Sequence, residues 1–422
     1  MSEPPEVDDA PIETHAPPKG ALGAIFLIVL ADLLGFSVII PLLPFWVRKY
    51  HASDFQVGLI FAIYSICQLI ASPILGLISD HFGRRPVLLG SQVGSMLGFL
   101  LLGYATLGDW SHAPALGLTL IYISRVIDGL SGGNISTAQA YISDVTTAEN
   151  RAKGMGMIGA AFGIGFTIGP AMGGILGHYN LSLPAFAAAT FAAIAALQTY
   201  LRLPESRVHK ESEAEAWLHP SRFLPIIRNA PLMQMLLIFF VSMMAFVMME
   251  STFAIYLNDL LKFTELHVGL LFALAGITIA VVQGGMVGKL TKKFGEWPLV
   301  ILGPVMVTIA MLLIAEQSWH ALVWLLIPTI MLNAGGRSLQ TPTLSALISH
   351  ASDPKQQGTV FGLFHMLGSL SRVIGPVIAT LVYTKHHAAP YFLAGAITFG
   401  AAIWTVMLRS QIEGRTAVPV SG

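Results

Sequence analysis

The 422-residue chain is 54% hydrophobic and only 11% charged. Soluble domains carry about 25% charged residues, so this chain has too few charges to cover a water-exposed surface of its size. Its 23 basic and 23 acidic side chains balance, and no basic surplus points to nucleic acid. The single cysteine, Cys67, excludes an intrachain disulfide, and Cys and His nowhere have the spacing of a zinc site, so we expect no metal and no other cofactor.

The chain begins with 19 acidic and Pro-rich residues, which have the wrong charge for the start of a secretory signal and predict a disordered tail. A membrane-spanning helix needs about 20 mostly apolar residues. Twelve runs of this kind follow, at 21–45, 57–78, 87–107, 115–140, 155–177, 184–203, 232–257, 267–290, 298–316, 320–347, 358–383 and 389–409. Residues 411–422 form a second tail.

A polar segment at 204–229 divides the spans six to six. We interpret it as a linker between an N-terminal bundle at 20–203 and a C-terminal bundle at 230–410. The two parts also repeat each other, because Gly, Phe, Gly and Pro recur at equal spacing in Gly76–Pro86 and in Gly288–Pro298. The sequence therefore predicts an all-α membrane protein with two pseudo-symmetric six-helix bundles.

Lys and Arg are distributed unequally between the predicted loops. Sixteen lie in the loops on the side of the termini and four in the loops on the other side. Because cytoplasmic loops carry the excess of positive charge, we expect both termini in the cytoplasm. The short loops favour a bacterial inner membrane, and we expect a monomer.

Four motifs accompany the spans. They read Asp32-Leu-Leu-Gly35 leading to Pro41-Leu-Leu-Pro44; Gly76-xxx-Asp80-xx-Gly83-Arg84-Arg85; Arg125-xx-Asp128-Gly129; and Gly165-xxx-Gly169-Pro170-xx-Gly173-Gly174. Together they make the chain resemble the major facilitator superfamily over residues 20–410. The resemblance implies a twelve-helix secondary transporter that works by alternating access. The last motif is typical of proton-driven drug antiporters, and the chain looks most like their tetracycline-efflux branch.

One departure bears on the substrate. Tetracycline exporters carry further acids inside the third and ninth spans, whereas the matching stretches here, around Gly94 and Gly303, contain none. This difference argues against a tetracycline–metal substrate. We expect a small amphipathic drug-like molecule or metabolite instead.

Six ionisable residues fall inside the predicted spans: Asp32, Arg125, Asp128, Glu250, Arg337 and Arg372. A charge at the bilayer centre costs about 2.5–3.5 kcal/mol, so such residues are functional candidates. Asp32 and Glu250 have no opposite charge three or four positions away, and we predict that they carry protons. A buried carboxylate that is merely hydrogen-bonded to Ser or Tyr is the alternative.

The intramembrane arginines have two readings each. Arg125 and Asp128 stand three apart on one helix, so a structural ion pair explains them as well as a functional one. Arg337 and Arg372 are candidates to receive an anionic group of a substrate.

The loop after the second span predicts a cytoplasmic gate. Gly76 permits close helix approach, and Asp80 is expected to accept hydrogen bonds at the start of the eleventh span, near Gly358. The charge network would comprise Gly83, Arg84, Arg85, Asp144 and Arg151. The alternative is that the arginines only set the topology. In the fifth span, Gly165, Gly169, Gly173 and Gly174 around Pro170 predict close packing, which alone would also explain them.

We therefore predict a proton-coupled antiporter that exports its substrate, with protons, a small molecule and lipid as partners. A proton-coupled importer or a uniporter for a polar or anionic metabolite is the alternative. A polytopic membrane enzyme is disfavoured because no nucleophile with its base, acid dyad or metal cluster is found.

Overall fold

The computed structural model describes residues 21–132, 134–146, 148–206, 224–320, 322–353 and 356–416, and these form helices and connecting turns with no strand. The helices of the first half are α1 (Ala21–Ile39), α2 (Leu43–Lys49), α3 (Asp54–Phe82), α4 (Arg84–Leu107), α5 (Pro114–Ser131), α6 (Asn134–Val145), α7 (Ala148–Tyr179) and α8 (Leu183–Arg202). Those of the second half are α9 (Leu224–Arg228), α10 (Ala230–Leu261), α11 (Glu265–Val281), the π-helical turn η3 (Val282–Met286), α12 (Val287–Phe294), α13 (Glu296–His320), α14 (Val323–Ala351), α15 (Gln357–Tyr383) and α16 (Ala389–Thr416).

Twelve crossings result, six in each half. Eleven candidate spans are apolar and long enough to cross a bilayer. The twelfth crossing is α14, whose 29 residues include Asn333, Arg337 and Gln340 and are therefore less apolar. It packs against α13, α11 and α10 inside the second half.

Two predicted spans are interrupted. The run at 21–45 ends as α1 at Ile39 and resumes as α2 after a turn at Pro41, because proline cannot donate the hydrogen bond that would continue the helix. The run at 115–140 divides into α5 and α6 at Gly132, where glycine disfavours an unbroken helix. The predicted linker at 204–229 contains α9 at its end.

The internal repeat is visible in the turns that join paired helices. Gly83, between α3 and α4, has φ +101°, and Gly295, between α12 and α13, has φ +78°. Both values lie in the region that only glycine adopts without strain. The repeated glycines therefore make the same turn in each half.

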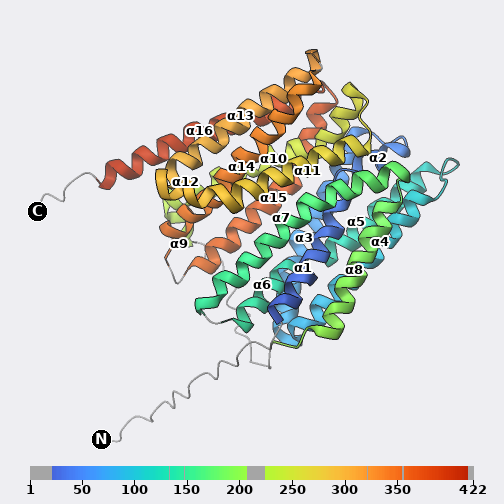
Figure 1. Cartoon of the computed structure of the whole chain (residues 1–422), viewed down its shortest axis with the longest axis horizontal. Coiled ribbons are helices and arrows are strands. Elements are labelled where there is room, and N and C mark those ends of the chain that lie inside the picture. Colours follow the sequence, from blue (N-terminus) through green and yellow to red (C-terminus); the bar gives the residue numbers. More distant parts are fainter. Residues whose placement is uncertain are drawn as a thin grey trace, which may run out of the picture.

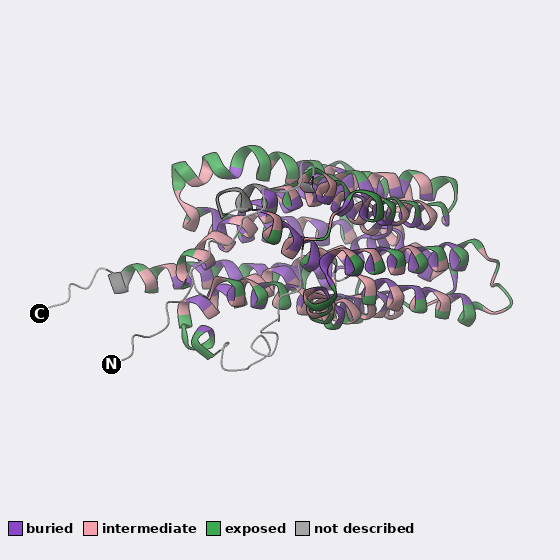
Figure 2. Ribbon diagram, turned by 90° about the horizontal axis from the view of Figure 1, so that it is seen from below, coloured by how far each residue is buried: buried purple, intermediate pink, exposed green. Residues whose placement is uncertain are grey.

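The two halves lie side by side, with α7 against α11 and α3 against α15 (Figure 1). The start of α1 and the end of α16 lie at the same end of the molecule, which we call the terminal end. We call the other end the opposite end. Exposed apolar side chains such as Ile70, Leu97 and Trp324 lie on the outer faces of the helices, as expected for contact with lipid (Figure 2).

The apolar cores show which end is closed. One cluster contains side chains from both halves, among them Trp46, Phe253 and Tyr391, and lies toward the opposite end. Two further clusters each belong to a single half and lie toward the terminal end, one around Tyr141 and one around Leu344. The halves therefore share a core at the opposite end and separate toward the terminal end.

Glycine contacts agree with this arrangement. A Cβ on Gly58 would collide with Thr380 of α15, and a Cβ on Gly174 would lie 2.9 Å from the Cα of Gly269 in α11. Toward the terminal end, a Cβ on Gly76 or Gly288 would meet no described atom within 4 Å. The structure is thus closed at the opposite end and open at the terminal end.

Candidate functional site

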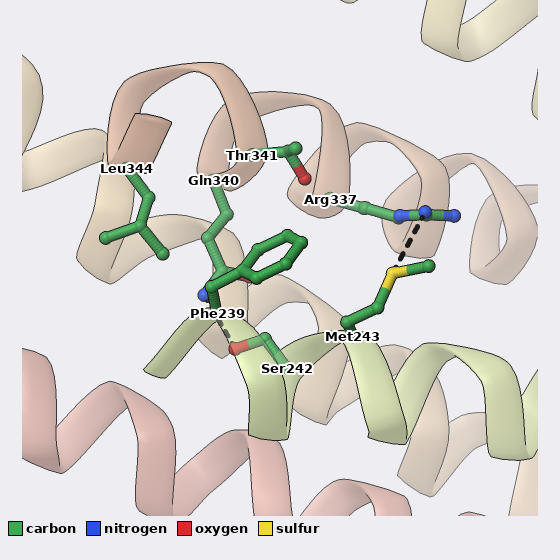
Figure 3. A pocket seen from close by; sticks show the side chains of 7 residues that line it. All are labelled: Phe239, Ser242, Met243, Arg337, Gln340, Thr341 and Leu344. Carbon is green, nitrogen blue, oxygen red and sulfur yellow. Dashed lines mark hydrogen bonds between the residues drawn. The ribbon is translucent and has the colours of Figure 1, made fainter. Parts of the chain in front are cut away.

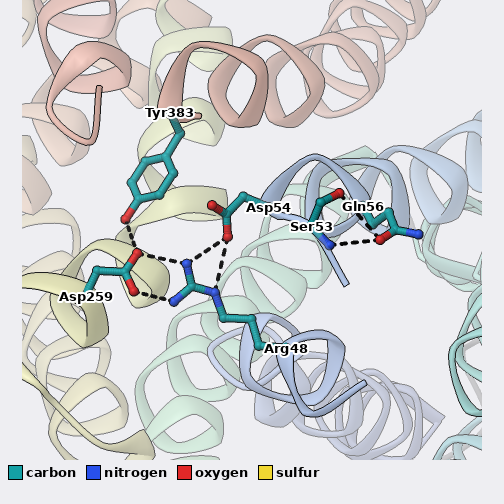
Figure 4. Close-up of polar contacts among 6 residues, drawn as sticks. All are labelled: Arg48, Ser53, Asp54, Gln56, Asp259 and Tyr383. Atoms are coloured by element: carbon teal, nitrogen blue, oxygen red, sulfur yellow. Dashed lines mark hydrogen bonds and ion pairs between the residues drawn. The ribbon is translucent and has the colours of Figure 1, made fainter. Parts of the chain in front are cut away.

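An ion-pair cluster joins the halves at the opposite end (Figure 4). Arg48, in the last turn of α2, binds both oxygens of Asp259 of α10, with N–O distances of 2.6 and 2.8 Å. It also binds Asp54, at the start of α3, at 2.7 Å. The Tyr383 hydroxyl of α15 donates to Asp259 at 2.7 Å. We call these four residues the outer latch.

The outer latch is held in place by the interruption of the first span. The turn at Pro41 lets α2 leave the direction of α1, which places Arg48 at the boundary between the halves. Burial by itself would lower the pKa of Arg48, but its hydrogen bonds to Asp259 and Asp54 raise that pKa above its ordinary value. Arg48 therefore stays charged. The latch was not among the predicted sites, because its partners are 211 residues apart in the chain.

A second charged cluster lies at the terminal end of the first half. Arg84 pairs with Asp80 at 2.7 Å and with Asp144 at 3.0 Å, and it donates to the Ser79 hydroxyl at 2.6 Å. It is 7% exposed, so these contacts are well shielded from water. The described ion-pair partner of Asp80 is thus Arg84, and its predicted contact near Gly358 stays a prediction.

Glu205 completes this cluster and was not predicted. Its carboxylate accepts hydrogen bonds from the backbone amides of Arg84 and Arg85, at 2.8 and 3.1 Å, and so caps the N-terminus of α4. A Cβ on Gly83 would lie 2.5 Å from this carboxylate, so only glycine fits there. Arg85 itself binds the carbonyl of Tyr200. The side chain of Arg151 lies outside the described residues.

Within the first half, Arg125 and Asp128 form an ion pair of 3.0 Å, and both are almost fully buried. Arg125 also lies over the ring of Phe99, with 5.6 Å to the ring centroid. Its Nη2 group has no hydrogen-bond partner among the described residues. The pair thus leaves one donor unused, as expected where a further polar group is bound at times.

Asp32 lies midway along α1 and is partly exposed. It lines a cavity of about 10 Å³, together with Gln92 of α4 and Ala138 of α6. On its other side, its charge acts on Tyr64 of α3, a residue that the sequence did not single out. The ring of Tyr64 stacks on Phe36, one turn along α1, with 5.3 Å between the ring centroids.

In the second half, the fold brings two arginines near Glu250. Arg337 of α14 and Arg372 of α15 both act on its charge, although none of these described residues closes to ion-pair distance. Glu250 is partly exposed, as are the two arginines. The sequence had Glu250 without a nearby opposite charge, because its basic neighbours lie 87 or more residues away.

The charges of both halves meet at Tyr64. Asp128, Arg125 and Asp32 of the first half act on its hydroxyl, and so does Arg372 of the second half. Arg372 therefore lies between Tyr64 and Glu250. The predicted intramembrane residues are gathered at the boundary between the two halves, and none of these acids is isolated in lipid.

Arg337 borders a cavity of about 20 Å³ in the second half (Figure 3). Its guanidinium lies 3.3 Å from the ring centroid of Phe246 and 3.6 Å from the sulfur of Met243. The cavity is completed by Gln340, which donates to Ser242 at 2.9 Å, and by Phe239. A cation, an amide and aromatic faces thus share one small space.

The helix-five motif makes two close contacts. Gly165, Gly169 and Gly173 face α1, where a Cβ on Gly169 would collide with Ser37, and Ser37 donates to the carbonyl of Gly165 at 2.8 Å. Gly174 and the carbonyl of Pro170 face Gly269 of α11 in the other half. The motif therefore packs one bundle internally and also forms the contact between the bundles.

Two six-helix halves, closed at one end and lined by buried charges at their boundary, define a membrane transporter. Residues 25–376 and 305–419 match the family model of the Major Facilitator Superfamily. The tetracycline resistance protein, class C, of Escherichia coli is 30% identical over 403 residues, which cover 94% of this chain and 97% of that protein. The chain belongs to the major facilitator superfamily, whose members are transporters and not enzymes.

Solved structures agree with this fold. The crystal structure of the human organic anion transporter MFSD10 (TETRAN) is 27% identical, with a TM-score of 0.68, and covers 92% of this chain and 100% of its own. The nucleoside transporter NupG is 13% identical, with a TM-score of 0.72, over 92% of this chain and 98% of its own. At that identity it supports the fold alone.

Proposed function

We propose that this protein is a proton-coupled antiporter that exports a small amphipathic molecule. The observation that carries the proposal is the position of Asp32 and Glu250, one in each half, among the charges that meet around Tyr64 and Arg372. An acid in that position can be protonated while the boundary faces one side of the membrane and deprotonated while it faces the other. The similarity to tetracycline resistance proteins supports export of a drug-like molecule.

In this proposal the substrate enters from the terminal end, which we place in the cytoplasm of a bacterial cell. The protein acts as a monomer. Entry of the substrate accompanies release of the proton, after which the halves rock and the outer latch opens. The Arg84 cluster is the cytoplasmic counterpart of the latch, in agreement with its shielded ion pairs.

Organic anions are the second candidate substrate class, and Arg337 favours them. Its described contacts are a ring and a thioether, which do not neutralise its charge. A carboxylate or phosphate would accept hydrogen bonds from its unused donors, while Phe239 and Phe246 would pack against an apolar body. The human relative of known structure is an organic anion transporter.

Reconstitution in vesicles with an imposed pH gradient tests the proposal. The probes are a cationic dye, a neutral amphipathic drug and an aromatic carboxylate. We expect the gradient to drive uptake of one class, and Asp32→Asn and Glu250→Gln each to abolish that drive. Glu316→Gln, in an exposed pair with His320, is the control and should be unaffected. Uptake that ignores the gradient, or full coupling in both variants, would exclude the proton sites.

A further inference from the structure

The cavity beside Asp32 contains polar groups that the protein leaves unpaired. Gln92 lines it and is fully buried, and its Oε1 accepts a hydrogen bond from Thr199 at 2.7 Å. Its Nε2 group finds no partner among the described residues, and neither do the hydroxyls of Thr137 and Tyr141 in α6. All three side chains are 0% exposed.

These groups form a series in depth. At 1.5 Å per helical residue, Asp32 lies about 16 Å from the start of α1, and Gln92 about 12 Å from the start of α4. Thr137 lies at a similar depth to Gln92, and Tyr141 lies about 6 Å from the end of α6. The charges of Asp144 and Glu205 act on Tyr141 from the terminal end. The unpaired groups thus lead from Asp32 to the Arg84 cluster.

The surroundings of the series are apolar. Tyr141 packs in one cluster with Ile25, Ile28 and Leu88, and two of these also line the cavity. An unpaired polar group in such a place costs about 1–3 kcal/mol, and a cavity of this size with polar walls can hold one water molecule. A bound water would satisfy the amide of Gln92 and reach the carboxyl of Asp32.

We infer that this cavity is a water-binding site and that water there, with Thr137 and Tyr141, conducts the proton between Asp32 and the terminal end. The inference rests on the proposed role of Asp32. The proton on Asp32 passes to the water. The Tyr141 hydroxyl accepts a proton on its oxygen and releases its own to water at the terminal end. The net change is an ionised Asp32 and one proton in solution.

This route runs inside the first half, between α1, α4 and α6, and not between the two halves. The substrate would use the boundary between the halves. Proton and substrate would then leave and enter from the same end without sharing a path. Exchange of one for the other would not require the substrate to wait for the boundary to empty.

Infrared spectroscopy after a rapid pH jump tests the route on the full chain in vesicles. The carboxyl band of Asp32 is identified by its loss in Asp32→Asn. Tyr141→Phe removes one hydroxyl, and Gln92→Leu removes the amide that faces the cavity. Tyr122→Phe is the matched control, because its hydroxyl binds the carbonyl of Gln56 toward the opposite end.

We expect the band to change about tenfold more slowly in Tyr141→Phe and in Gln92→Leu, which corresponds to the loss of one hydrogen bond. Its final amplitude should be unchanged, and the control should follow the unmodified protein. Unmodified rates in both variants would overturn the route and leave Asp32 as proton carrier. Absence of any band that depends on Asp32 would overturn the route and the proposed function together.

Discussion

Removal of the Arg48 charge should shift the protein toward the state that is open at the opposite end. Arg48 makes four hydrogen bonds, two of them to Asp259 across the boundary. Buried charge-assisted hydrogen bonds contribute about 1.5–3 kcal/mol each, whereas exposed ion pairs contribute about 0.2–1 kcal/mol. The side chains of Arg48 and Asp259 are 26% and 24% exposed, so the pair lies between these limits.

We expect Arg48→Gln to cost the closed state about 1–3 kcal/mol, which changes the ratio of the two states by about 5–150-fold. Asp259→Asn should act in the same direction. Because the two residues bind each other, the double variant should shift the equilibrium by less than the sum of the single effects. Tyr383→Phe, which loses one hydrogen bond, should have a smaller effect.

Electron–electron resonance between two spin labels measures the shift. Labels replace His112 and Lys385, which are exposed at the opposite end of the two halves, in a Cys67→Ser background. In Arg48→Gln a longer distance should gain population. Arg409→Gln, which breaks a pair within α16 only, should leave the distribution unchanged. An unchanged distribution in Arg48→Gln, with the protein folded, would refute the latch.

Three further predictions follow from single contacts. Gly169→Val should lower the thermal unfolding temperature in detergent by the equivalent of about 1–3 kcal/mol, because its side chain would overlap Ser37; Ala at exposed Gly23 is the control. Glu205→Ala should destabilise the protein by about 1 kcal/mol through loss of the α4 cap, with the same measurement, and an equal effect of Glu413→Ala would contradict this reason. Arg337→Gln should abolish uptake of an aromatic carboxylate while a cationic dye is still carried, and equal loss of both would exclude a specific anion contact.

The family and the helix count could be predicted because they depend on composition and on short motifs. An apolar run of about 20 residues has few alternatives to a spanning helix, since lipid offers no hydrogen bonds to the backbone. The places where the prediction was wrong are local: the spans at 21–45 and 115–140 each contain a break at Pro41 or Gly132. A hydropathy run does not report such breaks, because the apolar residues continue through them.

The sequence by itself determined which charges are placed in the membrane, among them Asp32, Glu250 and Arg372, because an ionisable residue in an apolar run is visible without coordinates. Only the tertiary structure decided what those charges face. Glu250 meets its arginines, and Arg48 meets Asp259, through contacts between helices that are distant in the chain. Local spacing carries no information on such pairs, since the packing of whole helices brings them together.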